Sequence, residues 1–236
     1  MRKRSFQFVM YCILTAIFMA GLLTFQILRW VHGVHVYSSE KAWLWEVRTF
    51  QISIDVISVI FAFFTFLKKG RKKVLDRDNL LFIFYVLLFT GDLLFSGLDI
   101  KTVGIVFYFL AFLVIPFLWN MNIFEIVLRI CALIGAPFLS YFISGNTWNF
   151  LHIMSIELAA LVTLNLVFAI MNVIKKKDLF SIFLLVFVVL AFLANVFICL
   201  RAVDVFTKFL KNVFAILVWP IYSVELIMIN ELYRKY

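Results

Sequence analysis

The stretch that decides the fold is residues 178–200, which read DLFSIFLLVFVVLAFLANVFICL and carry no charge after Asp178. A helix needs about 20 apolar residues to cross a hydrocarbon layer of ~30 Å. Transmembrane strands would instead alternate apolar and polar residues over ~10 positions, and this stretch does not. Seven further runs of the same kind fill the rest of the chain, at residues 6–29, 48–67, 79–97, 101–118, 122–144, 148–173 and 209–231. The sequence therefore predicts an all-α polytopic membrane protein, with eight transmembrane helices bundled into a single domain over 1–236.

The composition supports a membrane protein and excludes most soluble classes. Of 236 residues, 65% are hydrophobic and 15% are charged, whereas a soluble domain is roughly half apolar and about one quarter charged. No hydrophilic segment is long enough for a separate soluble domain. The net charge of +9 comes from residues at the ends of apolar runs, so it indicates membrane anchoring and no nucleic-acid partner. Each of the three cysteines, Cys12, Cys131 and Cys199, sits inside an apolar run, so we expect neither a disulfide framework nor a CxxC metal site. We also predict no cofactor.

The basic residues also predict the orientation. With the N-terminus inside, fourteen Lys and Arg residues fall in inner segments and seven in outer ones, the bias typical of cytoplasmic loops. This bias requires an even number of spans, so both termini are expected to be cytoplasmic. The first run follows Arg2, Lys3 and Arg4 but is longer than a signal-peptide core, and we interpret it as a retained helix. We expect an integral, multi-pass location, in the plasma membrane if the source is bacterial.

Four polar residues within the spans are predicted to lie at similar depths. From a rise of ~1.5 Å per residue, Asp92 is roughly 8 Å below the outer end of its helix, Asn195 roughly 9 Å, Asp55 roughly 10 Å and Glu157 roughly 14 Å. An ionisable side chain at such depth is a functional-site hypothesis by default. One interpretation is a shared polar pocket open toward the outer leaflet. The other is four separate helix–helix hydrogen bonds, each contributing about 0.6 kcal/mol.

Neighbouring residues extend the hypothetical pocket. Gln51 and Ser58 share a helical face with Asp55, because they lie four residues before it and three after it. Tyr85 lies on the Asp92 side of its helix, and Pro220 is expected to kink the last span. The pocket set is therefore Asn195, Gln51, Ser58, Tyr85, Trp219 and Tyr222.

Other charged groups have simpler interpretations. Glu125 and Arg129 are spaced i, i+4 and are predicted to form a structural ion pair. Glu225, on the last span, could reach the inner interface or line the same pocket from below. His32 and His35 have no third ligand nearby, so we predict no metal site.

Three motifs resemble the YhhN/lysoplasmalogenase family of eight-helix membrane proteins, which includes the TMEM-type lysoplasmalogenases. They are Gly91-Asp92-Leu93-Leu94, the glycine-led stretch GIVFYFLAF at residues 104–112, and Ala194-Asn195 followed by Arg201. The final Trp219-Pro220-Ile221-Tyr222 is similar to the ending of some bacterial members. The resemblance runs in order over residues 48–236.

The resemblance implies hydrolysis of the vinyl ether of lysoplasmalogen, with a membrane lysophospholipid as partner. Such a reaction needs an acid that protonates the vinyl carbon and a base that activates water. Asp92 would be one of the pair, but Asn195 stands where the family has a carboxylate and cannot exchange a proton. Phe112 and Leu113 occupy the stretch where the family has a further polar residue. Either Glu157 or Asp55 replaces the lost carboxylate, or the chain is a non-catalytic lipid- or small-molecule-binding protein. A transporter subunit is a third alternative, disfavoured because the sequence shows no internal repeat.

Overall fold

The computed structural model describes residues 2–34, 43–69, 76–119, 121–143, 145, 148–202 and 206–235, without the side chains of 2–5 and 201–202. Within these ranges, eight helices are long and apolar enough to span a membrane. The predicted all-α polytopic bundle is therefore confirmed, and the chain is a multi-pass integral membrane protein. The helices are α1 Arg2–Val31, α2 Leu44–Lys69, α3 Arg77–Asp92, α4 Lys101–Val114, α5 Ile123–Ile143, α6 Phe150–Lys176, α7 Leu179–Ala202 and α8 Lys208–Lys235.

Two spans end in a different helical geometry. Helix α3 continues into the π-helical segment η1, Leu93–Gly97, and α4 continues into the 3₁₀ turn η2, Ile115–Leu118. Pro116 stands in η2 and has no N–H to donate to the carbonyl of Phe112, four residues earlier. That carbonyl accepts a hydrogen bond of 3.0 Å from the side chain of Asn165 instead. Pro137 lies inside α5, and Pro220 lies inside α8, the span that the sequence predicted to be kinked.

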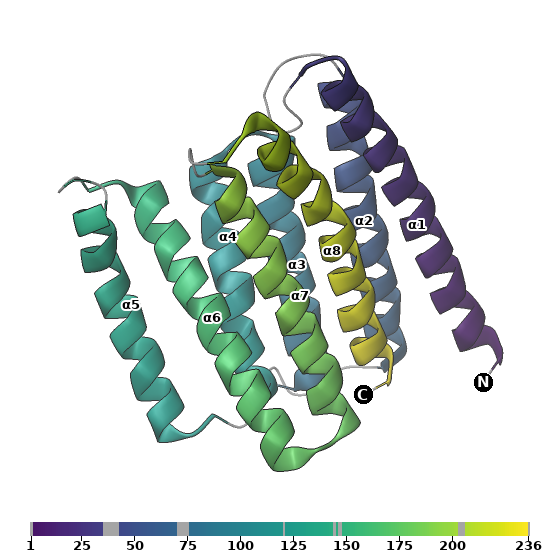
Figure 1. The fold of residues 1–236 in the computed structure, drawn as a ribbon. Helices are drawn as coiled ribbons and strands as arrows, with labels where there is room; N and C mark the ends of the chain where they lie inside the picture. The colour runs from purple at the N-terminus through teal and green to yellow at the C-terminus, as the bar shows by residue number, and fades with distance from the viewer. Residues whose placement is uncertain are drawn as a thin grey trace.

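Seven of the described helices form a closed ring of neighbours, and α5 lies outside this ring (Figure 1). Around the ring, neighbours pack in the order α1, α2, α3, α4, α6, α7, α8 and back to α1. Helix α8 also contacts α2 and α3, so it is the most buried of the spans. Helix α5 packs mainly against α6 and lies at the edge of the bundle. Because α8 meets α2 and α3, polar residues on these three helices can share one interior.

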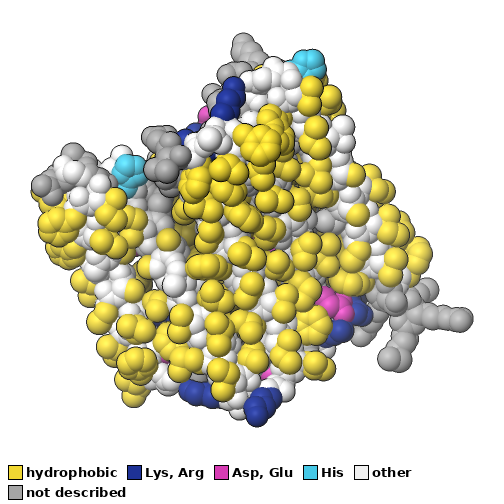
Figure 2. Space-filling view, viewed as in Figure 1, with side chains coloured by type: hydrophobic (Ala, Val, Ile, Leu, Met, Phe, Trp, Pro, Cys, Tyr) yellow, Lys and Arg dark blue, Asp and Glu magenta, His cyan; other side chains and the backbone are white. Residues whose placement is uncertain are grey.

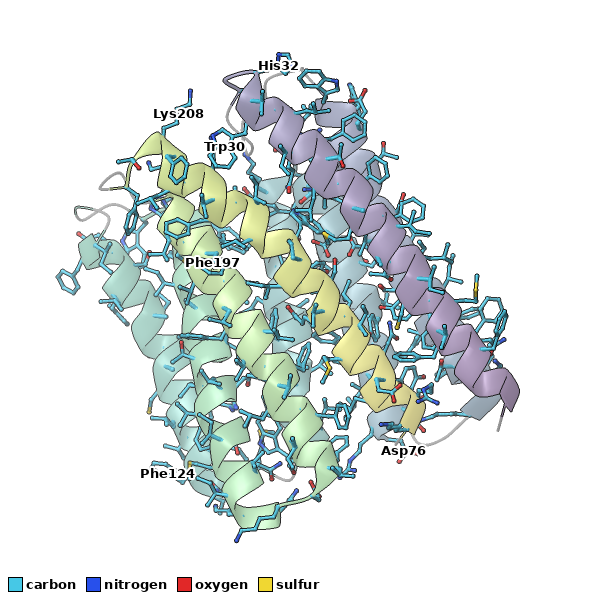
Figure 3. All side chains as sticks on the ribbon, turned by 45° about the vertical axis from the view of Figure 1, so that its right-hand side comes forward. Trp30, His32, Asp76, Phe124, Phe197 and Lys208 are labelled. Atoms are coloured by element: carbon cyan, nitrogen blue, oxygen red, sulfur yellow. The ribbon has the colours of Figure 1, made fainter. Side chains whose placement is uncertain are left out.

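The two termini lie at the same end of the bundle (Figure 1). Asp76, at the start of α3, and Phe124, at the start of α5, lie toward that end (Figure 3). Trp30, His32 and Lys208 lie at the opposite end. This arrangement is what an even number of crossings requires. The charge bias continues to predict that the end with the termini is cytoplasmic.

The surface between the two ends is apolar. In Figure 2, hydrophobic side chains cover the middle of the visible face, and the Lys and Arg side chains gather near its ends. Helix α5 is one example, because it exposes a long series of large apolar residues that includes Ile123, Phe124, Ile134, Phe138 and Phe142. Lipid chains would cover such a surface at no cost, which explains why side chains this apolar remain exposed.

Polar residues cap the two ends of α6 and the start of α7. The side chain of Asn149 accepts hydrogen bonds from the backbone N–H groups of Leu151 and His152 at the start of α6. Lys177 ends α6 in the left-handed conformation, with φ of 53°. Asp178 then accepts a bond of 2.7 Å from the backbone N–H of Ser181. Hydrogen bonds from Ser181 stabilise the carboxylate and hold the pKa of Asp178 below its usual value.

Candidate functional site

Asp92 lies at the end of α3 and is almost completely buried, with 4% of its surface exposed. The hydroxyl of Tyr108 on α4 donates to its Oδ1, and the hydroxyl of Tyr222 on α8 donates to its Oδ2. Each oxygen of the carboxylate therefore has its own donor. Two such donors stabilise negative charge in an interior where water is scarce.

A close approach of α3 to α4 positions Tyr108. A Cβ added to Gly104 would lie 2.7 Å from Cβ of Phe95, 2.8 Å from the backbone N of Phe95 and 3.0 Å from the carbonyl O of Gly91. Only glycine fits at this contact. Because Tyr108 follows Gly104 by four residues, one helical turn carries its hydroxyl to Asp92. The π-helical segment that begins directly after Asp92 lies at the same contact, and such segments are frequent at functional sites.

Asp55 brings a second carboxylate to this interior from α2. It is 2% exposed and interacts electrostatically with Asp92. Neither of its oxygens has a hydrogen-bond partner among the residues that the structure describes. Tyr222 lies close enough to interact with both carboxylates, but its hydroxyl donates to Asp92. Ionisation of a buried group without donors is costly. The two carboxyl groups therefore have unequal surroundings, because two tyrosine hydroxyls donate to Asp92 and no described residue donates to Asp55.

Glu225 adds a third carboxyl group, three residues after Tyr222 on α8. It is 1% exposed and interacts electrostatically with Asp92 and with Tyr85. Tyr85 in turn donates a hydrogen bond of 2.9 Å to the carbonyl of Leu226. Of the two alternatives for Glu225, the structure therefore favours the interior position over the inner interface.

A second group of polar residues continues from the carboxylates toward the end with the termini. Tyr11 of α1 and Ser58 of α2 share a hydrogen bond of 3.1 Å. Asn230 of α8 lies close to Tyr11, and neither polar atom of its amide has a partner within the described ranges. The buried polar groups thus follow the seam between α1, α2 and α8.

Not all of the residues selected from the sequence meet at the carboxylates. Glu157 is half-buried on α6, which packs against α4, α5 and α7. The Asn195 side chain donates to the carbonyl of Ala191, 2.8 Å away on its own helix. Gln51 is half-buried one turn before Asp55. The structure therefore brings together Asp55 and Asp92 of the four residues predicted to share a depth.

Among the aromatic residues of the site, Trp219 and Tyr222 were predicted from the sequence, and Tyr108 and Tyr11 were not. Trp219 is buried and its ring stands edge-on to that of Tyr222, with centroids 5.2 Å apart. Tyr108 was missed as a site residue, although its spacing of four from Gly104 was a usable signal. Tyr11 was also missed, because nothing in the sequence indicates which face of α1 turns inward.

The predicted Glu125–Arg129 ion pair is confirmed and belongs to a separate structural network. The two side chains approach to 2.8 Å. Trp119 donates to Glu125 at 2.9 Å, and Arg129 donates to Asn165 at 2.8 Å. These contacts join α5 to the end of α4 and to α6, which explains how the outermost helix is held.

The outer loop residues give no ligand set. The ring of His32 lies against Trp43, with centroids 4.9 Å apart. His35 falls outside the described residues. Over the part of the chain that is described, no three His, Cys, Asp or Glu side chains gather to hold a metal ion.

The assembled site holds three buried carboxyl groups that interact electrostatically and have unequal hydrogen-bond partners. Pairs of this kind divide the roles of acid and base in many enzymes. Comparison of the chain with protein-family models, with curated proteins and with solved structures gives no match.

Proposed function

We propose that this chain is a membrane-embedded hydrolase in which Asp55 and Asp92 form an acid–base pair. One observation carries the proposal: the two carboxyl groups interact in the bundle interior, but two tyrosines donate to Asp92 and none of the described residues donates to Asp55. Asp55 is then the proton donor and Asp92 the base. Tyr108 and Tyr222 hold the base in place.

The substrate that we propose is the vinyl ether of a lysoplasmalogen. The motifs at Gly91-Asp92 and at residues 104–112 support this class, because their resemblance to lysoplasmalogenases covers the residues that build the site. A single-chain lipid is also compatible with a site enclosed by apolar helices. Asn195 leaves a carboxylate missing from the family pattern, and the position of Asp55 beside Asp92 supports Asp55 as its replacement.

The first half of the reaction consumes one water. Asp55 gives its proton to the vinyl carbon that is not bonded to oxygen, and the ether oxygen shares the positive charge that results on the other vinyl carbon. Asp92 removes a proton from water as the water oxygen bonds to the charged carbon. The product is a hemiacetal, with Asp55 now ionised and Asp92 protonated.

The second half restores both groups. Asp55 takes the proton of the hemiacetal hydroxyl, and Asp92 protonates the ether oxygen as its bond to carbon breaks. A fatty aldehyde and a glycerophospho-alcohol leave. Each carboxyl group thus ends in the protonation state in which it began, so the cycle needs no further reactant.

The test is aldehyde release from lysoplasmalogen by the purified protein in lipid nanodiscs. We expect Asp92→Asn and Asp55→Asn to lower the rate by at least about 10²-fold, the usual contribution of a general acid or base. Glu46→Gln is the matched control, because Glu46 is an exposed carboxylate at the start of α2. A lysolipid with a saturated ether should not react, because it has no vinyl carbon to protonate.

Two results would contradict this assignment. If the unmodified protein releases no aldehyde, the hydrolase proposal fails. If Glu157→Gln abolishes turnover while Asp55→Asn does not, the second carboxylate comes from α6 and the proposed pair is wrong.

A non-catalytic binding protein is the second candidate. Its support is the set of buried polar atoms that have no partner among the described residues, namely both oxygens of Asp55, Oε1 of Glu225, Oγ of Ser223 and the amide of Asn230. A polar ligand could satisfy them. Thermal stabilisation by a lysolipid without any aldehyde would favour this function over hydrolysis.

A further inference from the structure

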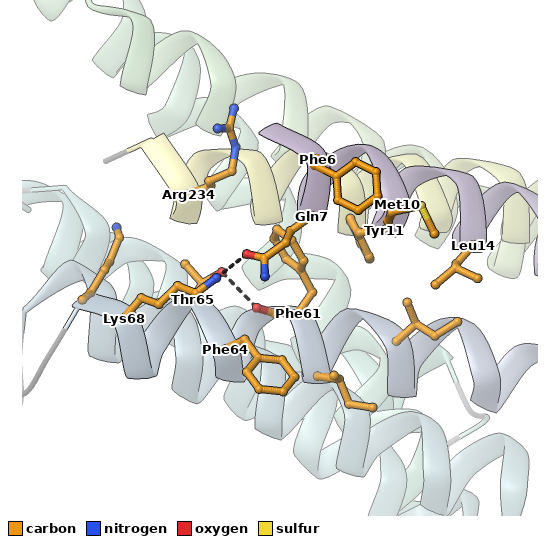
Figure 4. Close-up of a pocket in the computed structure, with 13 residues that line it drawn as sticks. Phe6, Gln7, Met10, Tyr11, Leu14, Phe61, Phe64, Thr65, Lys68 and Arg234 are labelled. Atoms are coloured by element: carbon orange, nitrogen blue, oxygen red, sulfur yellow. Dashed lines mark hydrogen bonds between the residues drawn. The ribbon is translucent and has the colours of Figure 1, made fainter. Parts of the chain in front are cut away.

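A groove opens on the bundle surface between α1 and α2, with a volume of about 390 Å³ (Figure 4). Its walls are mainly apolar and include Phe6, Met10 and Leu14 of α1, with Ile60 and Phe64 of α2. A volume of roughly 300 Å³ or more is enough for a small ligand. The position of the groove on the outside of the membrane-spanning surface makes it accessible to lipid chains.

Cationic side chains stand at one end of this groove, the end with the termini (Figure 4). Two of them already have carboxylate partners. Lys69 lies 2.7 Å from Asp78, and Arg234 lies 2.7 Å from Glu231. Each of these two cations therefore has a carboxylate at ion-pair distance, and Glu231 also pairs with Lys235 at 3.0 Å.

Lys68 differs from these two. Its amine donates to the side-chain oxygen of Gln7, a neutral group, and the structure gives it no carboxylate within the described ranges. Both side chains are exposed at the mouth of the groove. An uncompensated positive charge therefore stands where the apolar walls end.

We propose that this groove binds an anionic phospholipid of the leaflet on the side of the termini. One acyl chain lies between α1 and α2, and the phosphate lies against Lys68. Charge complementarity selects this occupant, because basic pockets beside transmembrane helices bind acidic headgroups. The acyl chain of a zwitterionic lipid would occupy the apolar groove equally well, but its headgroup would be attracted less strongly to Lys68.

The groove is distinct from the proposed hydrolytic site. Asp55 and Lys68 are thirteen residues apart on one helix, which corresponds to roughly 20 Å at a rise of ~1.5 Å per residue. The vinyl ether of a lysoplasmalogen is close to its headgroup. A lipid anchored at Lys68 would therefore hold its reactive bond far from Asp55, and this inference does not depend on the proposed function.

The test compares two lipids with identical acyl chains, phosphatidylglycerol and phosphatidylcholine, added to the full chain in detergent. Native mass spectrometry measures the fraction of protein that carries a lipid. We expect tighter binding of phosphatidylglycerol, and a loss of about fivefold in its affinity for Lys68→Gln, the effect of one basic residue near the surface. Lys175→Gln is the matched control, because Lys175 is exposed at the same end of the bundle on α6.

A second variant tests the apolar half of the site. Ile60→Trp would fill the groove and should weaken both lipids, while the protein remains folded by thermal unfolding. Equal losses for Lys68→Gln and Lys175→Gln would overturn the proposal, because they would indicate diffuse surface charge. Unchanged phosphatidylglycerol binding by Ile60→Trp, or equal affinity for the two lipids, would also overturn it.

Discussion

Replacing Gly104 by alanine would push α4 away from α3 at the contact that positions Tyr108. The added Cβ would meet Cβ of Phe95 at 2.7 Å, whereas ordinary contact begins at 3.4 Å, a difference of about 0.7 Å. It would also meet the backbone N of Phe95 at 2.8 Å. Backbone cannot rotate out of the way as a side chain can, so the two segments must separate.

The magnitude follows from two opposing effects. Overpacking a close contact costs about 1–3 kcal/mol, while exchanging glycine for alanine within a helix gains up to about 1 kcal/mol. Gly135 of α5 offers the second effect alone, because a Cβ there would meet nothing within 4 Å. Gly104→Ala should therefore be less stable than Gly135→Ala by about 1–3 kcal/mol.

Thermal unfolding of the two variants in the same detergent provides the assay. For a chain of this size, 1 kcal/mol corresponds to a Tm shift of about 2–4 °C, so the two should differ by about 2–12 °C. Gly91→Ala should fall between them, since its Cβ would meet the Tyr108 ring at 3.2 Å and the carbonyl O of Gly104 at 3.3 Å, both less close than the contacts at Gly104. If Gly104→Ala melts at or above the temperature of Gly135→Ala, the close contact and its role in positioning Tyr108 are refuted.

Three other substitutions test the buried polar groups. Tyr222→Phe should lower stability by about 1–3 kcal/mol because it removes a donor from a buried carboxylate; in an Asp92→Asn background its cost should be smaller, and equal costs in both would contradict the hydrogen bond. Arg129→Leu should lower stability by about 3–5 kcal/mol because it leaves Glu125 buried without its cation, and the double variant with Glu125→Leu should recover most of this loss in a chemical-unfolding titration. Asp178→Ala should cost about 1 kcal/mol at pH 7 because it removes the cap of α7. Folding lowers the pKa of Asp178, so its contribution to stability is present above pH ~3.9 and is lost as the pH falls through the lower pKa of the folded state. If the unmodified protein and Asp178→Ala still differ by the same free energy of unfolding in strong acid, this role of Asp178 is contradicted.

The sequence was sufficient to predict the eight spans and their even number, which places both termini at the same end of the bundle. Each of the eight runs can be recognised separately, because transfer into lipid and hydrogen bonding within a helix depend on residues close together in sequence. The ion pair of Glu125 and Arg129 was predictable for the same reason, since four residues form one helical turn. Asp92 could be selected because a charged residue in an apolar run is rare.

Only the tertiary structure decided which polar residues meet. Depth along the membrane did not distinguish Asp55, which interacts electrostatically with Asp92, from Glu157, which lies on a helix packed against α4, α5 and α7. Lipid chains are as apolar as the bundle interior, so the pattern of hydrophobic residues does not mark the inward face of a spanning helix. The neighbours of α8, and with them the group of Asp55, Asp92 and Glu225, depend on packing between side chains far apart in the sequence, which no local pattern records.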